Sequence, residues 1–161
     1  MRIIGLFLGE ISMEKSFSWD HTESNLYPRI SLSDCTLSTI VISNKAISFG
    51  FDEGFLVSES NSVLFHQASS AEITIFGETV NEMEVYKEPY RQKNYPDKSL
   101  LYVPLNVFQE SINSKEMICS FVEEYYSING VIYKLFFKEK SAKGWIYLSI
   151  DLDNIVYNWN D

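Results

Sequence analysis

Few residues of this chain have the types and spacing that chemistry requires, and the most suggestive are two aspartates. Asp151 and Asp153 are separated by one residue and follow an apolar run that ends at Ile150. Paired carboxylates at the end of a strand can supply a nucleophile and an acid-base group, or oxygen ligands for a divalent metal. A metal-dependent hydrolase that uses Asp151 and Asp153 is therefore one candidate function.

This Asp-x-Asp spacing resembles the first motif of haloacid-dehalogenase-type phosphatases and the metal site of many glycosyltransferases. Both families place the motif inside a parallel sheet with long stretches of chain after it, whereas ten residues follow Asp151 here. The Gly and Glu positions of an EF-hand loop are also missing after Asp151. We therefore expect an exposed strand end that binds no metal, and we expect no cofactor.

Other catalytic signatures are missing from the sequence. It contains no Gly-x-Ser-x-Gly elbow, no phosphate-binding loop and no Gly-x-Gly-x-x-Gly fingerprint. The two histidines, His21 and His66, are far apart and lack the spacing of a helical zinc site. We predict no catalytic residue, and we expect a binding protein rather than an enzyme.

The charge of the chain indicates the kind of partner. The sequence has 22 acidic and 13 basic side chains, a formal net charge of −9. Such a chain repels nucleic acid and anionic membranes and favours a basic protein partner. Between Asp52 and Glu88, eight acidic side chains accompany one basic side chain, a net −7 that predicts an acidic surface.

Length and pattern predict one domain, residues 1–161, that is rich in β-structure. A two-residue turn at Asn44-Lys45 predicts a hairpin with Ile42 opposite Ile47 and Ile40 opposite Phe49. Residues 10–34 have no clear pattern and are expected to be loop. Further short strands are expected at 55–58, 63–67, 71–76 and 79–87.

The pattern changes near residue 115. The spacing of Ile118, Phe121, Val122 and Tyr125 predicts a principal amphipathic helix at 115–128 with Ser114 as its N-cap. A shorter helical turn at 105–112 precedes it, and a C-terminal β-hairpin follows at 131–138 and 144–152. The expected class is α+β with a largely antiparallel sheet. The predicted core includes Ile40, Ile42, Ile118, Phe121, Val122, Ile146, Leu148 and Ile150.

Two strand faces could meet a partner. Alternation places the side chains of Trp145 and Tyr147 on the face opposite the core stripe, and it aligns Glu82, Glu84 and Tyr86 on another strand. These faces could also be solvated, or the first could be covered by a helix. The predicted partner-binding residues are Glu82, Glu84, Tyr86, Glu88, Trp145, Tyr147, Asp151 and Asp153.

In size, acidity, α+β pattern and lack of catalytic motifs, the chain resembles the immunity proteins of bacterial contact-dependent growth-inhibition and other polymorphic toxin systems. The resemblance includes no diagnostic motif and therefore assigns no residues. It implies a protein that binds a toxin domain, often a basic nuclease, and masks its active site. Oligomerisation through the aromatic strand face is a third hypothesis.

The expected location is the cytoplasm. The apolar run at 3–9 is followed by charged residues rather than a cleavage site, and it is shorter than a membrane span, so we expect a buried strand there. Cys35 and Cys119 each lie in an apolar stretch, which is typical of buried free thiols in a reducing compartment.

Overall fold

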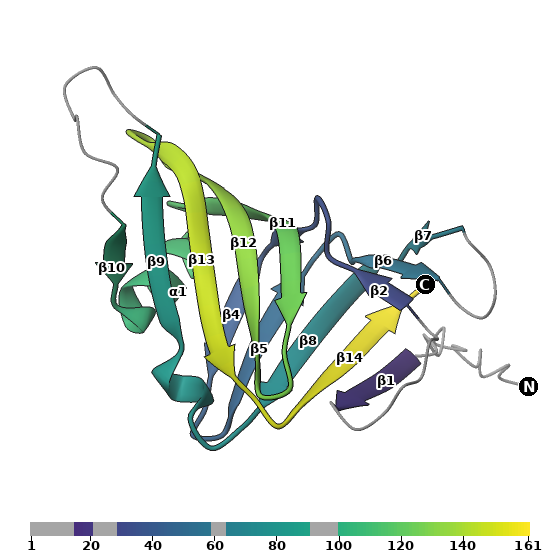
Figure 1. The fold of residues 1–161 in the computed structure, drawn as a ribbon. Coiled ribbons are helices and arrows are strands. Elements are labelled where there is room, and N and C mark those ends of the chain that lie inside the picture. Colours follow the sequence, from purple (N-terminus) through teal and green to yellow (C-terminus); the bar gives the residue numbers. More distant parts are fainter. Residues whose placement is uncertain (1–14, 21–28, 59–63, 91–99) are drawn as a thin grey trace, which may run out of the picture.

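A computed structural model describes residues 15–20, 29–58, 64–90 and 100–161, and the structural statements below concern these residues. Two antiparallel sheets pack face to face (Figure 1). The five-stranded sheet has the order β1 (Lys15–Asp20), β14 (Asn154–Asn160), β8 (Ser70–Phe76), β5 (Ala46–Phe51) and β4 (Thr39–Ile42). The six-stranded sheet has the order β10 (Leu101–Val103), β9 (Glu84–Pro89), β13 (Lys143–Asp151), β12 (Gly130–Lys138), β11 (Ile118–Tyr126) and β3 (Thr36–Leu37).

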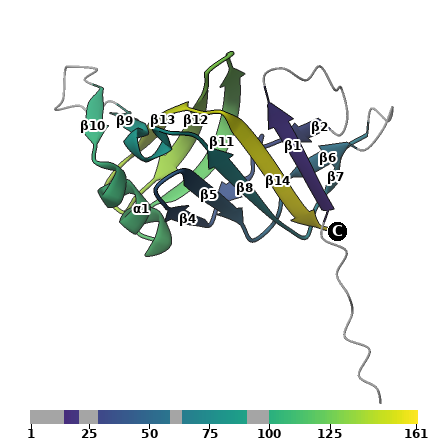
Figure 2. The same ribbon diagram turned by 90° about the horizontal axis from the view of Figure 1, so that it is seen from below.

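Smaller elements lie at opposite ends of this pair of sheets (Figures 1 and 2). At one end, helix α1 (Leu105–Asn113) packs against β4 and β9 and buries Phe108 and Ile112. At the other end, β2 (Arg29–Ser31), β6 (Leu56–Ser58) and β7 (His66–Gln67) form a third sheet. A short 3₁₀ turn, η1 (Val80–Glu82), leads into β9.

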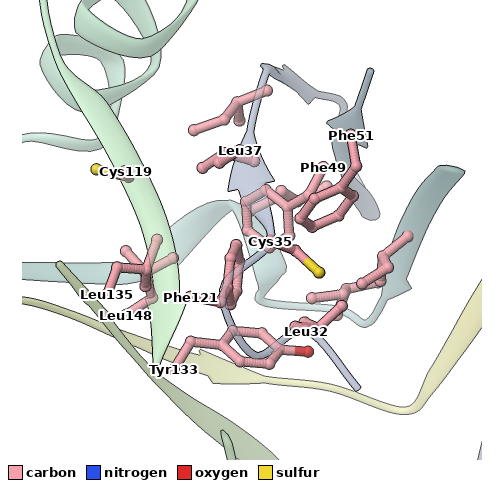
Figure 3. Close-up of a cluster of buried hydrophobic side chains, with 14 of the residues drawn as sticks. Leu32, Cys35, Leu37, Phe49, Phe51, Cys119, Phe121, Tyr133, Leu135 and Leu148 are labelled. Carbon is pink, nitrogen blue, oxygen red and sulfur yellow. The ribbon is translucent and has the colours of Figure 1, made fainter. Parts of the chain in front are cut away.

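The inner faces of the two large sheets form one continuous core (Figure 3). At its centre, the ring of Phe49 from the five-stranded sheet packs against Phe121 and Tyr133 of the six-stranded sheet, with both centroid distances at 6.3 Å. Phe121 and Tyr133 lie 5.2 Å apart, edge to face. Such contacts add specific geometry to the apolar area that the sheets bury.

The chain passes between the two sheets at Ser38. The preceding residues, β3, pair with β11 of one sheet, and the following residues, β4, pair with β5 of the other. Ser38 is buried, and its polar groups are satisfied: its N–H donates to the Gly50 carbonyl, its Oγ accepts from the Asp52 N–H, and its carbonyl accepts from Lys115 Nζ. Complete hydrogen bonding is what allows a polar residue to occupy a buried corner.

The edge strand β4 is capped by helix α1. Asn113 uses both atoms of its amide, because Oδ1 accepts from the Ile40 N–H at 2.8 Å and Nδ2 donates to the Ile40 carbonyl at 2.9 Å. Gln109 also donates to that carbonyl, at 3.1 Å. The two side chains occupy the outward hydrogen-bonding groups of Ile40, which another strand would use, and this protects the middle of the edge from unwanted pairing.

Much of the expected β-structure is confirmed. In the β4–β5 hairpin Ile40 lies opposite Phe49 and Ile42 opposite Ile47, and β12 and β13 form the predicted C-terminal hairpin. The described chain is mostly antiparallel sheet with one α-helix, which is compatible with the α+β class.

Cys35 and Cys119 are buried free thiols, and burial raises the pKa of both.

The principal helix predicted at 115–128 is wrong. Residues Ile118–Tyr126 form strand β11, and the helix α1 lies instead where only a short turn was expected, so that Ser114 is its C-cap rather than an N-cap. A bulge between Phe121 and Glu123 inserts one extra residue against β12. This insertion breaks the period of two, and the resulting spacing of apolar residues imitates a helix.

Other corrections follow from the same coordinates. Ile118 was expected in the core but is 53% exposed, and Ile42 and Val122 are only half-buried, whereas the other predicted core residues are buried. The segment expected as loop at 10–34 contains β1, β2 and the buried Leu32. The first part of the expected strand 79–87 is η1, and the strand itself begins at Glu84. The expected strand at 3–9 lies outside the described residues.

Replacing Phe121 with Ala should lower the free energy of unfolding by about 3–5 kcal/mol, because the ring is fully buried between the sheets. Ile118→Ala is the matched control on the same strand, and it should cost at most about 1 kcal/mol. Chemical denaturation measures both. Equal losses at the two positions would contradict the strand assignment, since only a helix would bury both side chains.

Replacing Asn113 with Ala should cost about 1–2 kcal/mol, because the substitution leaves the Ile40 N–H without its partner. Asn106→Ala, in the exposed first turn of the same helix, should change stability by about 0.5 kcal/mol or less. Denaturant titration of the two variants gives the difference. An indistinguishable pair would show that α1 does not protect β4 through this amide.

Candidate functional site

The outer face of the six-stranded sheet brings together residues that the sequence placed on two separate strands. Val85 on β9 and Ile146 on β13 point into the core, so their neighbours point outward. The antiparallel pairing places Trp145 opposite Glu88, Tyr147 opposite Tyr86, and Ser149 opposite Glu84. The two predicted surfaces are therefore one surface, and none of the other described helices and strands lies in front of it in Figure 1.

Neighbouring strands extend this surface with residues that the sequence analysis did not identify. Ile132, Lys134 and Phe136 project from β12, and their alternation with buried residues was visible in the sequence. Glu123 and Tyr125 project from β11, a segment that the sequence analysis predicted as helix. We define the outer face as Glu84, Tyr86, Glu88, Tyr90, Tyr102, Glu123, Tyr125, Ile132, Lys134, Phe136, Trp145 and Tyr147.

The aromatic rings of the outer face pack on one another. Tyr90, Phe136 and Trp145 form a triangle with centroid distances of 6.1, 5.8 and 5.9 Å. Tyr86 and Tyr102 form a second pair at 6.0 Å. Because these rings rest on paired strands and on one another, they present a rigid apolar surface to a partner.

A cation already lies on this surface. The Lys134 ammonium is 4.5 Å from the centroid of the Trp145 ring and 3.8 Å from Glu123 Oε2. A ring face and a carboxylate attract the same positive charge, and the attraction strengthens as water is excluded. The space between Trp145 and Glu123 is therefore filled by the chain's own ammonium group.

Tyrosine hydroxyls hold the carboxylates of the outer face in place. Tyr86 Oη donates to Glu84 Oε2 at 2.8 Å, and Tyr125 donates to Glu123. Each hydrogen bond raises the pKa of the donating phenol, because the carboxylate stabilises the protonated form. The pKa of Tyr147 is raised first by partial burial and then by Glu88. The phenols therefore remain neutral donors at neutral pH.

The remaining predicted residues lie outside this group. Glu82 lies in η1 rather than on the strand, which corrects its predicted alignment with Glu84. Asp151 ends β13, roughly 20 Å along the strand from Trp145. Asp153 lies in the corner between the two sheets, where its N–H donates to the Phe76 carbonyl.

Among the described residues, no three His, Cys, Asp or Glu side chains are grouped as a metal site requires.

The acidic window between Asp52 and Glu88 does not form one surface. Asp52 and Glu53 follow β5, Glu72 lies on the other sheet, and Glu78 pairs with Lys45 at 3.2 Å. Of the eight acids only Glu84 and Glu88 belong to the outer face, with Glu82 next to the start of β9, while Glu59 lies outside the described residues. At the end of the outer face nearest the β12–β13 turn, the side chains of Lys138 and Lys143 are also exposed.

The outer face of the five-stranded sheet has a different composition. Most of its side chains are small and polar, with Val41 and Phe76 as exposed apolar exceptions, and Ser48 and Thr74 bond to each other at 3.1 Å. Such side chains are typical of a solvated strand surface. This sheet face is represented by Ser16, Ser18, Thr39, Ser48, Glu72, Thr74 and Asn158.

A second polar group lies between the sheets. After the β11 bulge Glu124 points inward, where Oε2 accepts from the Leu32 N–H at 3.0 Å and Oε1 accepts from Tyr126 Oη at 2.7 Å. The Tyr126 ring is 43% exposed, but its hydroxyl lies 3.4 Å from that of the buried Tyr157. Burial raises the pKa of Glu124, and the two hydrogen bonds only partly oppose that effect.

Comparison with protein-family models, with curated proteins and with solved structures finds no match to this chain. No helix in the described ranges has the length and apolar character needed to cross a membrane. The function must therefore be argued from the geometry of the chain itself.

The raised pKa of Glu124 predicts a pH dependence. Between the usual value of 4.5 and the folded-state pKa, the folded chain keeps a proton that the unfolded chain loses, so stability falls as pH rises through this window. Each pKa unit corresponds to about 1.4 kcal/mol. Glu124→Gln removes the buried charge; its amide oxygen can still accept from the Leu32 N–H, and its NH2 can donate to Tyr126 Oη in place of the original bond. Its stability relative to the parent should therefore increase with pH.

Denaturation at a series of pH values measures this difference. Glu116→Gln removes one exposed carboxylate and controls for net charge. A Glu124→Gln variant that loses stability relative to the parent above pH 4.5 would show that the ionised carboxylate is the favoured form.

Proposed function

We propose that this chain is a binding protein that holds a basic protein partner against the outer face of its six-stranded sheet. The observation that carries the proposal is the display of aromatic rings and carboxylates together on that face, with the Lys134 ammonium held between Trp145 and Glu123. The same chemistry would receive an arginine or lysine of another protein. Tyrosine and tryptophan are also the residues that most often dominate binding energy at protein interfaces.

The specific form that we propose is an immunity protein that neutralises a toxin domain by masking its active site. Support comes from the net charge of −9 and from the carboxylates fixed by tyrosine hydroxyls on a rigid sheet. A toxin that acts on nucleic acid must attract phosphate, so its active site is basic and complementary to an acidic surface. A cytoplasmic location is part of this proposal.

The partner should be captured from the source organism, identified, and then purified so that its affinity can be measured. Glu84→Lys combined with Glu88→Lys should weaken binding at least about tenfold, because two local attractions become repulsions. Glu53→Lys combined with Glu72→Lys changes net charge equally at exposed sites away from the outer face and is the matched control. Equal loss in the two pairs would show that only net charge matters and would contradict the site.

The same measurement separates aromatic from electrostatic binding. Trp145→Ala should weaken binding by about 2 kcal/mol or more if the ring is a hot spot, whereas Phe76→Ala, an exposed ring on the other sheet, should have no effect. If the partner is a toxin domain, each weakened variant should also lose inhibition of its activity. Binding that tolerates both Trp145→Ala and the Glu84/Glu88 reversal would refute the outer face as the site.

A further inference from the structure

The edge strands of the two large sheets differ in how they are protected. The backbone of β4 is capped by Asn113 and Gln109, and β3 is only two residues long and runs through Ser38 into β4. On β1 the exposed side chains Ser16 and Ser18 are polar. Polar side chains, side-chain caps and short length all discourage strand pairing.

Strand β10 is also short, at three residues, but among the described residues it has neither a side-chain cap nor polar side chains on its outer face. Its one paired neighbour in the described chain is β9, and no described residue bonds to its other side. Leu100, Leu101 and Tyr102 are 52, 47 and 62% exposed. An open edge with apolar side chains is a surface to which an extended peptide can add as a further strand.

The outer face next to this edge determines which peptide fits. In the β9–β10 pair Tyr102 lies opposite Tyr86, and Glu84 and Glu88 lie two residues to either side of Tyr86 on the same face. A strand added beside β10 would place one outward side chain next to Tyr102. The outward side chains two residues before and after it would align with the two carboxylates, roughly 9–10 Å away across two strand spacings.

Long basic side chains can cover most of that distance, and the glutamate side chains cover the rest. The basic residue of β9, Lys87, does not oppose them, because it points to the inner side, where it pairs with Glu139 at 2.6 Å and lies over Phe137. The charge at this edge therefore favours a cationic segment over a second copy of this acidic chain.

We propose that β10 accepts an extended segment of the partner as an added strand, with an apolar residue beside Tyr102 and arginine or lysine two residues to either side. This inference rests on the proposed function and states how the basic partner is held. Main-chain hydrogen bonds to β10 would supply affinity, and Glu84 and Glu88 would supply the preference for basic residues.

The probe is a labelled synthetic peptide in which arginine, tyrosine and arginine alternate with threonine, and its binding to the full chain is followed by fluorescence anisotropy. A peptide with glutamate in place of arginine should bind at least about tenfold more weakly. The Glu84→Lys and Glu88→Lys pair should cause a similar loss, whereas the Glu53→Lys and Glu72→Lys pair should leave binding unchanged.

Backbone methylation of the peptide tests strand addition directly. Successive N–H groups of a strand point to opposite edges, so only one of two peptides, methylated either at the arginine and tyrosine positions or at the threonine positions, should lose affinity, by about tenfold. In the complex, hydrogen exchange should slow at the backbone amide of Tyr102, which points to the open edge, whereas the amides of Leu101 and Val103 point to β9. This readout does not respond to binding on the outer face alone.

Equal affinity of the two methylated peptides, or unchanged exchange in β10, would overturn strand addition. The outer face would remain supported as the binding site if the Glu84→Lys and Glu88→Lys pair weakened binding of the purified partner. Failure of the arginine peptide to bind, with the partner still bound, would likewise overturn this inference alone. Dimerisation of the chain that Tyr102→Lys abolishes would show that a second copy occupies the edge, and would overturn it as well.

Discussion

The structure depends on one constraint, which is that each large sheet has one face in a shared core. The alternation of side chains along each strand therefore decides which are buried and which are exposed to solvent. On β13, Ile146 and Leu148 must be buried to meet the opposite sheet, and this requirement places Trp145 and Tyr147 outside. Pairing with β9 then sets those rings against Glu88 and Tyr86. The candidate site is therefore a consequence of core packing combined with antiparallel register.

The bulge in β11 changes this rule at one place, with consequences on both sides of the sheet. Before the bulge, the odd-numbered Cys119 and Phe121 point inward. After it, the even-numbered Glu124 points inward, so the alternation has shifted by one residue. Outward, the extra residue places Glu123 opposite Lys134, where it helps to hold the ammonium over Trp145. Inward, it buries a carboxylate that the fold must compensate with two hydrogen bonds. One inserted residue thus produces the cation site and a local cost in stability.

The sequence was informative where local alternation and turns decide the structure. The β4–β5 register and the outward residues of β9 and β13 followed from a period of two, and the exceptions are Glu82, which lies in η1, and Asp153, which lies beyond the end of β13. Strand β14 was missed, although Ile155, Tyr157 and Trp159 alternate with polar residues there. The helix error arose from the bulge, which no local pattern marks. The pairing of β9 with β13 joins distant segments, so the sequence could not show that two acidic and aromatic strands form one surface.

The two solvent-facing sheet surfaces show that the fold does not require an aromatic exterior. On the five-stranded sheet, small residues such as Ser48 and Thr74 cover most of the outside, and Phe76 at the end of β8 is the one exposed ring among the described residues there. Cross-strand aromatic pairs do stabilise a sheet, by roughly 0.2–1 kcal/mol each. That gain is smallest for Tyr102 and Ile132, which remain 62 and 44% exposed and so leave much of their apolar area open to solvent. Rings and apolar side chains that stay exposed beside ordered carboxylates have the composition of a binding surface, and no described element covers them, which is why the proposed function is assigned to this face.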